Sequence, residues 1–236
     1  MAVPLSSFFL ILFLGTFPSL LWLFYYLRKD AHPEPKELIL QFFLTGFLLP
    51  PFVGFAEVLL QQSLSVSLTP LLAYTILVIL ASLWEEAAKY LAARSIFHHE
   101  REFDEMTDGM IYLITVGLGF ASSENVIIAL SSFVQDPSQD IFVLLSLRAI
   151  GSTLLHTLAS GLIGYFLARK LFLHERFSLL KGFAAAIAIH ALFNLFILQI
   201  SWNRPYFIFF VILLLAGGLT LILKDFYNLR RYDVKQ

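Results

Sequence analysis

The chain has no cysteine and few charged residues for its length. Only 14% of its 236 residues are charged, whereas soluble globular proteins contain about 25%. The absence of cysteine excludes disulfides, thiolate metal ligands and a cysteine nucleophile. The net charge of −1 supplies no field that would attract a polyanion, so we expect no nucleic-acid partner.

Apolar residues are abundant instead. They make up 58% of the chain, which includes 25 Phe, and the mean hydropathy is +0.79. A soluble protein of this size cannot bury so much apolar surface, and this composition also excludes a disordered chain and a coiled coil. A helix needs roughly 20 apolar residues to cross the bilayer core. Seven stretches meet this length: about 5–27, 38–60, 70–93, 109–133, 141–168, 182–200 and 205–223.

These stretches predict an all-α fold, a polytopic transmembrane helix bundle of about seven spans that forms one integral membrane domain over residues 1–236. Pro50 and Pro51 lie in the middle of the second stretch, where they must kink or interrupt the helix because proline donates no backbone hydrogen bond. The long connection from Arg94 to Asp108 is acidic, and we expect a helix cap at Thr107 or Asp108.

The basic residues predict the orientation in the membrane. Most of them fall in the odd-numbered connections and the C-terminal tail: Arg28, Lys29, Lys36, Arg94, Arg101, Arg169, Lys170, Arg176, Lys181, Lys224, Arg230, Arg231 and Lys235. The even-numbered connections contain only Arg204. Because loops rich in Lys and Arg stay in the cytoplasm, we expect the N-terminus outside and the C-terminus in the cytoplasm.

Several ionisable or amide side chains lie inside the predicted spans: Glu85, Glu86, Lys89, Glu124, Arg148, His156, His190 and Asn194. A charged side chain at mid-membrane costs at least ~2.5–3.5 kcal/mol, so such residues are functional candidates. Glu85 and Lys89 are four residues apart and share one helix face, and Glu86 is three residues from Lys89. His190 and Asn194 share a face in the same way.

The expected depth of each residue tests whether these side chains can meet. At ~1.5 Å per residue from the cytoplasmic helix ends, Glu86, His156 and His190 lie about 12–18 Å deep and can meet. Glu124 lies deeper, at about 21–25 Å. Near the outer ends of their spans, Glu57 is expected to be a surface carboxylate, and Arg148 an anchor or an ion-pair partner.

This residue set suits activation of water by a carboxylate. The chain lacks a His-Glu-x-x-His zinc motif, a pair of aspartates in the span centres and a Gly-x-Ser-Gly element. A glutamate near histidine can act as a general base, and two histidines with one glutamate form a common catalytic zinc set. The residues therefore favour an intramembrane hydrolase.

Several segments also carry motifs in a defined order. They are Trp84-Glu85-Glu86-Ala87-Ala88-Lys89, Phe120-Ala121-Ser122-Ser123-Glu124-Asn125, His156, and His190 with Asn194, preceded by Asp30 to Pro35. Together they resemble the PrsW family of intramembrane proteases, which has Glu-Glu-x-x-Lys and Phe-x-x-x-Glu motifs and is related to the CAAX prenyl endopeptidase and Abi superfamily. The resemblance covers about residues 25–200.

The resemblance implies a multi-pass protein of the bacterial or archaeal inner membrane that cleaves a membrane-anchored protein. It also implies an anti-sigma-factor-like substrate and a role in regulated intramembrane proteolysis during stress. CAAX-type relatives have His where this chain has Glu124. Their resemblance implies a mechanism that uses glutamate and histidine and does not require a metal ligand.

We therefore expect an intramembrane peptidase with its site between the third and sixth predicted spans, about residues 70–200. Glu86 is the expected general base for a zinc-bound water, with Glu85 paired to Lys89, although the sequence does not distinguish the base from a ligand in this pair. Glu124, His156 and His190 are the expected ligands of Zn²⁺, and Asn194 is the expected oxyanion donor.

Three alternatives remain open. The first is a metal-independent glutamate/histidine protease. The second is a non-catalytic membrane binding or immunity protein, and the third is a proton- or ion-coupled transporter.

Overall fold

The computed structural model describes residues 3–30, 32–65, 69–97 and 103–233. This part of the chain is helical, contains no strand and has seven segments long and apolar enough to span a membrane. The predicted all-α bundle of about seven spans is confirmed. The helices are α1 (Leu5–Leu27), α2 (Lys36–Leu48), α3 (Pro50–Ser65), α4 (Pro70–Phe97), α5 (Met106–Gln135), α6 (Ile141–Ile150), α7 (Ser152–Phe172), α8 (Ser178–Ser201) and α9 (Phe207–Asp233).

Two of the seven spans are each made of two consecutive helices. α2 and α3 meet at Leu49, whose carbonyl oxygen accepts hydrogen bonds from the backbone N–H groups of Phe52 and Val53. This is the interruption that Pro50 and Pro51 predict. α6 and α7 meet at Gly151, with φ −87° and ψ −83°. The sequence predicts a continuous fifth span, because a single glycine breaks a helix much less strongly than two prolines do.

α5 is the central helix, since 78% of its most apolar stretch is buried. It packs against α7 through small residues. A Cβ atom on Gly109 would lie 2.8 Å from the carbonyl oxygen of Gly164, and one on Gly117 would lie 2.9 Å from Cβ of Ser160. Because these glycines have no side chain, α5 and α7 can approach each other closely.

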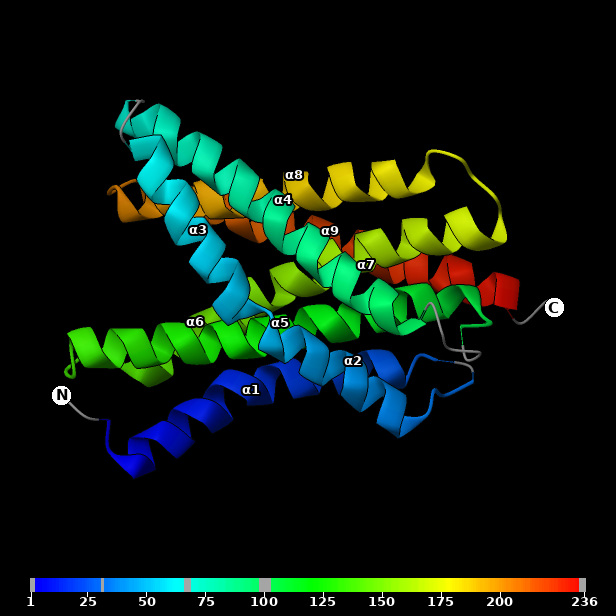
Figure 1. Ribbon diagram of the computed structural model, residues 1–236, viewed down its shortest axis with the longest axis horizontal. Helices are drawn as coiled ribbons and strands as arrows, with labels where there is room; N and C mark the ends of the chain where they lie inside the picture. Colours follow the sequence, from blue (N-terminus) through cyan, green and yellow to red (C-terminus); the bar gives the residue numbers. More distant parts are fainter. Residues whose placement is uncertain (1–2, 31, 66–68, 98–102, 234–236) are drawn as a thin grey trace.

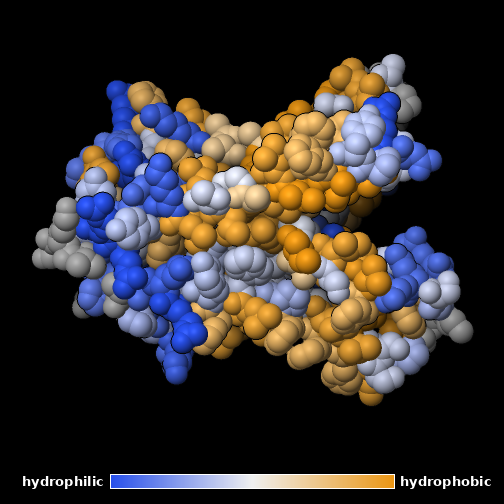
Figure 2. Space-filling model, turned by 180° about the vertical axis from the view of Figure 1, so that it is seen from behind, coloured by the Kyte–Doolittle hydropathy of each residue, from blue (hydrophilic) through white to orange (hydrophobic). Residues whose placement is uncertain are grey.

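The helix connections and the two termini gather at the two ends of the bundle. The connections α1–α2, α4–α5 and α7–α8 and the C-terminus lie at one end, and the N-terminus lies at the other (Figure 1). Hydrophilic side chains gather at both ends of the space-filling view, with a hydrophobic belt between them (Figure 2). This arrangement agrees with the alternation of basic connections in the sequence.

The start of α5 and the end of α9 pack together at the basic end. Glu105 is the N-cap of α5 and forms a reciprocal capping box with Asp108, so the cap lies two residues before the predicted Thr107. Both carboxylate oxygens of Asp233 accept hydrogen bonds from the first backbone N–H groups of α5, those of Met106 and Thr107. α9 therefore continues ten residues beyond the predicted end of the last apolar stretch, at 223.

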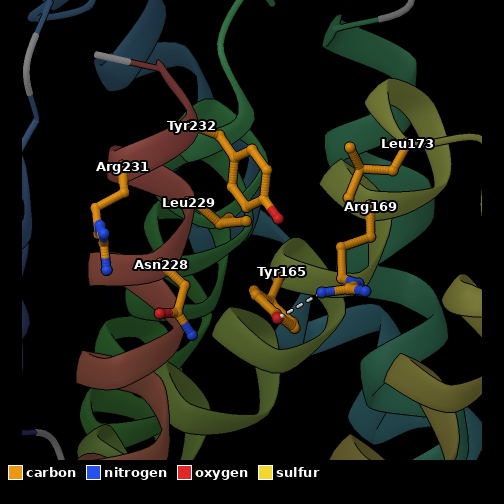
Figure 3. A pocket seen from close by; sticks show the side chains of 7 residues that line it. All are labelled: Tyr165, Arg169, Leu173, Asn228, Leu229, Arg231 and Tyr232. Carbon is orange, nitrogen blue, oxygen red and sulfur yellow. Dashed lines mark hydrogen bonds between the residues drawn. The ribbon is translucent and has the colours of Figure 1, made fainter. Parts of the chain in front are cut away.

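A polar cavity of about 320 Å³ opens between the ends of α7 and α9. Figure 3 shows Arg169 of α7 pointing toward the hydroxyl of Tyr165, to which it donates a hydrogen bond of 2.9 Å, with Asn228 and Tyr232 of α9 on the opposite wall. Arg169 also forms an ion pair with Glu175. None of the predicted site residues lines this cavity.

Candidate active site

The acidic pair and the lysine of α4 are buried together. Glu86 and Lys89 are fully buried, and Glu85 is 7% exposed. The Lys89 ammonium lies 2.7 Å from Oε1 of Glu86 and 3.4 Å from Oε2 of Glu85. It also lies 4.3 Å from the centre of the Phe120 ring, a cation–π contact. Lys89 therefore does not reach the membrane surface but balances charge inside the protein.

The two histidines come from α7 and α8 and face this acidic pair. His190 has Nδ1 2.8 Å from Oε1 of Glu86 and Nε2 3.7 Å from Oε1 of Glu85. His156 has Nδ1 2.8 Å from the Lys89 ammonium and 3.9 Å from Oε2 of Glu85. The two imidazole rings are 5.3 Å apart and meet edge to face. Both histidines are 1–2% exposed, so the cluster is buried inside the protein.

Hydrogen-bond chemistry fixes the tautomer of His156. An ammonium group can only donate, so Nδ1 of His156 accepts from Lys89. The ring proton is then on Nε2, which donates to Oε2 of Glu124 at 3.0 Å. His156 thus links the α4 acidic pair to Glu124 of α5.

Glu124 lies on the side of His156 that is remote from Glu85 and Glu86. Its Oε2 also accepts from Nη2 of Arg148 at 2.8 Å. Arg148 donates in turn through Nε to Oδ1 of Asn125 at 2.7 Å. The sequence predicts that Arg148 is an anchor or an ion-pair partner. In the structure it forms an ion pair with Glu124. The sequence predicts that Glu124 lies deeper in the membrane than the two histidines. In the structure, the His156 side chain nevertheless reaches Glu124.

Four side chains of this site converge closely enough to hold a metal ion. One ligand atom each from Glu85, Glu86, His156 and His190 lies within 4.8 Å of the others. Within the described ranges, Oε2 of Glu86 is buried and has no hydrogen-bond partner. Carboxylate and imidazole donors of this kind suit zinc and other divalent transition metals. The Lys89 ammonium lies among the same acceptors, which shows that this site accommodates a positive charge.

Asn194 and Glu57 flank this group. Asn194 follows His190 by one turn of α8 and is half-buried. Glu57 of α3 is also half-buried, and it interacts electrostatically with Glu85, Glu124 and His190. The sequence predicts a surface carboxylate for Glu57, near the outer end of its span. The Pro50-Pro51 interruption is the sequence feature that could have predicted this position, because it changes the direction of the chain before Glu57.

Comparisons with known proteins find similarity to a family of membrane proteases. The profile of the family described as "PrsW family intramembrane metalloprotease" matches residues 34–217. Protease PrsW of Geobacillus kaustophilus is 27% identical over 173 residues, which cover 72% of each chain. Protease PrsW of Clostridioides difficile is 29% identical over 209 residues, 85% of each chain. Protease PrsW of Bacillus subtilis is 26% identical over 166 residues, 70% of each chain. No solved structure matches the chain.

Proposed function

The chain belongs to the PrsW family of intramembrane metalloproteases, and we propose that it hydrolyses a peptide bond of a membrane-anchored protein with Glu86 as general base and zinc as its metal. Family membership makes it a multi-pass protease of the bacterial membrane. The observation that carries the mechanism is the convergence of four buried carboxylate and imidazole ligands within 4.8 Å.

The proposed ligands are Nδ1 of His156, Nε2 of His190 and the carboxylate of Glu85. Both nitrogens face Glu85, at 3.9 Å and 3.7 Å. The other nitrogen of each ring is held by a carboxylate, Glu124 for His156 and Glu86 for His190. A ligating histidine commonly has such a partner, which fixes its tautomer and orientation. This arrangement favours Glu124 as the residue that orients His156, with Glu85 in the ligand position that the sequence analysis gave to Glu124.

Glu86 has the geometry of a general base. Its Oε1 is held by Lys89 and by Nδ1 of His190, so the carboxylate cannot rotate freely. Its Oε2 is buried and, in the described part of the chain, free to take a proton. A bound divalent ion would supply a Lewis acid that acidifies water and polarises the scissile carbonyl group. Glu86 would receive the proton of the attacking water at Oε2 and return it to the leaving amine.

Two neighbours complete the proposed machinery. Lys89 keeps Glu86 ionised by offsetting its charge at 2.7 Å. Asn194, one turn beyond His190, is the proposed donor to the oxyanion that forms on the substrate carbonyl. The proposed substrate is a single-span membrane protein of the anti-sigma-factor kind.

One observation favours a second candidate mechanism. The Lys89 ammonium already contacts Glu85, Glu86 and Nδ1 of His156, so the charges of this site are balanced by the chain itself. A metal-independent protease would use the same Glu86 as base, with His190 holding its Oε1.

The deciding experiment reconstitutes the purified protein in vesicles with a tagged single-span anti-sigma factor and measures cleavage and bound metal together. We expect the wild type to carry about one zinc per chain and to cleave. Glu86→Gln should keep the metal and lose about 10²–10⁴ in rate, because only the proton acceptor is removed. Full activity of the wild type after chelation, with no metal bound, would replace zinc by the metal-independent mechanism.

A further inference from the structure

Three mainly apolar grooves lie between neighbouring helices in the described part of the chain. They have volumes of about 500 Å³ between α1 and α2, about 310 Å³ between α3 and α4, and about 560 Å³ between α8 and α9. Of these three grooves, the one between α3 and α4 alone has an ionisable side chain in its lining, Glu57. The other residues that line this α3–α4 groove are Ala56, Leu60, Leu80, Ala81, Leu83 and Trp84.

The α3–α4 groove adjoins the candidate active site. Trp84, on its wall, directly precedes Glu85. Glu57 interacts electrostatically with Glu85, Glu124 and His190 across the site. In Figure 1, α3 and the first half of α4 run together toward the N-terminal end and diverge from α5 and α6. Figure 2 shows the molecule hollowed between two lobes at this same end.

One oxygen of the Glu57 carboxylate has no hydrogen-bond partner among the residues that the structure describes. This oxygen, Oε1, is buried. An unpartnered buried acceptor is costly, so its presence in an apolar groove calls for a donor from outside the chain. A lipid tail would fill the apolar walls but has no donor to offer.

A membrane-spanning substrate supplies such donors only where it is cleaved. Within an intact helix each backbone N–H donates to the carbonyl four residues earlier, and the peptide bonds are shielded. Hydrolysis requires the helix to open locally, which frees N–H groups that have no water to bind in the bilayer. An acceptor beside the catalytic residues would satisfy these groups at the point of cleavage.

We propose that the α3–α4 groove holds the membrane-spanning segment of the substrate and that Glu57 accepts hydrogen bonds from its backbone where the helix opens. This inference rests on the proposed function and names the surface by which that site receives its substrate. Glu57 is a substrate-binding residue in this account, and it takes no part in the proton transfer assigned to Glu86.

Photo-crosslinking tests the groove directly. A benzophenone amino acid replaces Leu83 on the groove wall or, as a matched control, Leu213 in the α8–α9 groove; both leucines are exposed. The background is Glu86→Gln, so the probe is not consumed. The probe is a synthetic single-span peptide of leucine and alanine with a central Gly-Gly, in vesicles of phosphatidylethanolamine and phosphatidylglycerol. We expect crosslinks from position 83 and only background from position 213.

Substitutions of Glu57 test its role. Glu57→Leu should lower the yield from position 83 about tenfold, which corresponds to about 1.4 kcal/mol for a hydrogen bond to a charged acceptor. Glu57→Gln retains an acceptor oxygen and should keep most of the yield. A peptide without the Gly-Gly should crosslink equally in the Glu57 and Glu57→Leu proteins, because its N–H groups are already paired.

Equal yields at positions 83 and 213 would overturn the inference, as would a yield that Glu57→Leu leaves unchanged. Crosslinks between two copies of the chain would assign the groove to self-association instead. Because the background is inactive, this result is independent of catalysis. If the wild type cleaves its substrate but the Glu86→Gln protein gives no crosslink from position 83, only the role of the groove is refuted. If the Glu86→Gln protein crosslinks from position 83 but the wild type cleaves no substrate, the proposed function is refuted.

Discussion

At the scale of single residues, the site depends on side chains that fix one another. The Lys89 ammonium determines which nitrogen of His156 is protonated, and that proton determines the contact with Glu124. The sequence could identify Glu85, Glu86, His156 and His190 as a group because charge inside a membrane span is costly. It could not order them around a metal, because side-chain direction depends on how α4, α7 and α8 pack.

Loss of Lys89 should destabilise the folded protein. Lys89→Met leaves Glu86 buried with its main charge partner removed, and breaking a buried pair in this way typically costs about 3–5 kcal/mol. We expect a clearly lower free energy of unfolding in detergent, measured by denaturation monitored through intrinsic fluorescence. Lys36→Met is the matched control, since Lys36 is exposed at the start of α2 and should tolerate the same substitution. Equal free energies of unfolding for the two variants would contradict the claim that Lys89 stabilises the buried charge of Glu86.

A second carboxylate gives a pH-dependent prediction. Burial raises the pKa of Glu34, and Asp30 and Asp104 add to the rise, against hydrogen bonds from Tyr112 and Asp108. A raised pKa in the folded state means that Glu34 favours folding at low pH and that this contribution is lost as the pH rises through its folded pKa. Glu34→Gln should therefore raise the melting temperature at pH 8 more than at pH 5.

The control for this measurement is Glu37→Gln, which removes an exposed carboxylate from the first turn of α2. If Glu34→Gln changes the melting temperature by the same amount at pH 5 and at pH 8, relative to the wild type, burial of Glu34 does not oppose its ionisation.

At the scale of elements, close contacts between helices position the site. The sequence predicted the break between α2 and α3, because proline cannot donate a backbone hydrogen bond. It missed the break at Gly151 and the last ten residues of α9, which are held by contacts distant in the sequence, such as the Asp233 cap on α5. Long apolar runs thus define the spans, while their ends and breaks depend on tertiary partners.

Glycines at the helix contacts should be intolerant of a methyl group. A Cβ on Gly164 would lie 2.7 Å from Cα of Met110, so Gly164→Ala forces α5 and α7 apart. Overpacking of this kind typically costs about 1–3 kcal/mol. Gly54→Ala is the matched control, because a Cβ there meets nothing within 4 Å, and alanine favours the helix. Thermal unfolding should separate the two variants, and similar midpoints would refute the tight α5–α7 contact.

At the scale of the whole molecule, the bundle brings together residues from four spans that no single stretch of sequence contains. Membership of a protease family supports the enzyme interpretation over the non-catalytic and transporter alternatives. The orientation in the membrane rests on the basic connections and remains a prediction.

A pair of C-terminal fusions tests that orientation. Green fluorescent protein, which matures in the cytoplasm, should be fluorescent when fused after Gln236, and alkaline phosphatase, which is active only outside, should be inactive there. The reverse pattern would place the basic connections outside and invert the depths expected for the site.

The assignment of Glu85 as a metal ligand is tested most directly by the bound zinc of two isosteric variants, Glu85→Gln and Glu124→Gln, measured by elemental mass spectrometry after dialysis against a series of zinc concentrations up to saturation. Glu85 faces both ligand nitrogens, whereas Glu124 contacts only the opposite nitrogen of His156. Glu85→Gln should lose its metal, whereas Glu124→Gln should bind zinc about 10–100-fold more weakly but still fill at saturation. An empty Glu124→Gln protein beside a fully loaded Glu85→Gln protein would contradict this assignment.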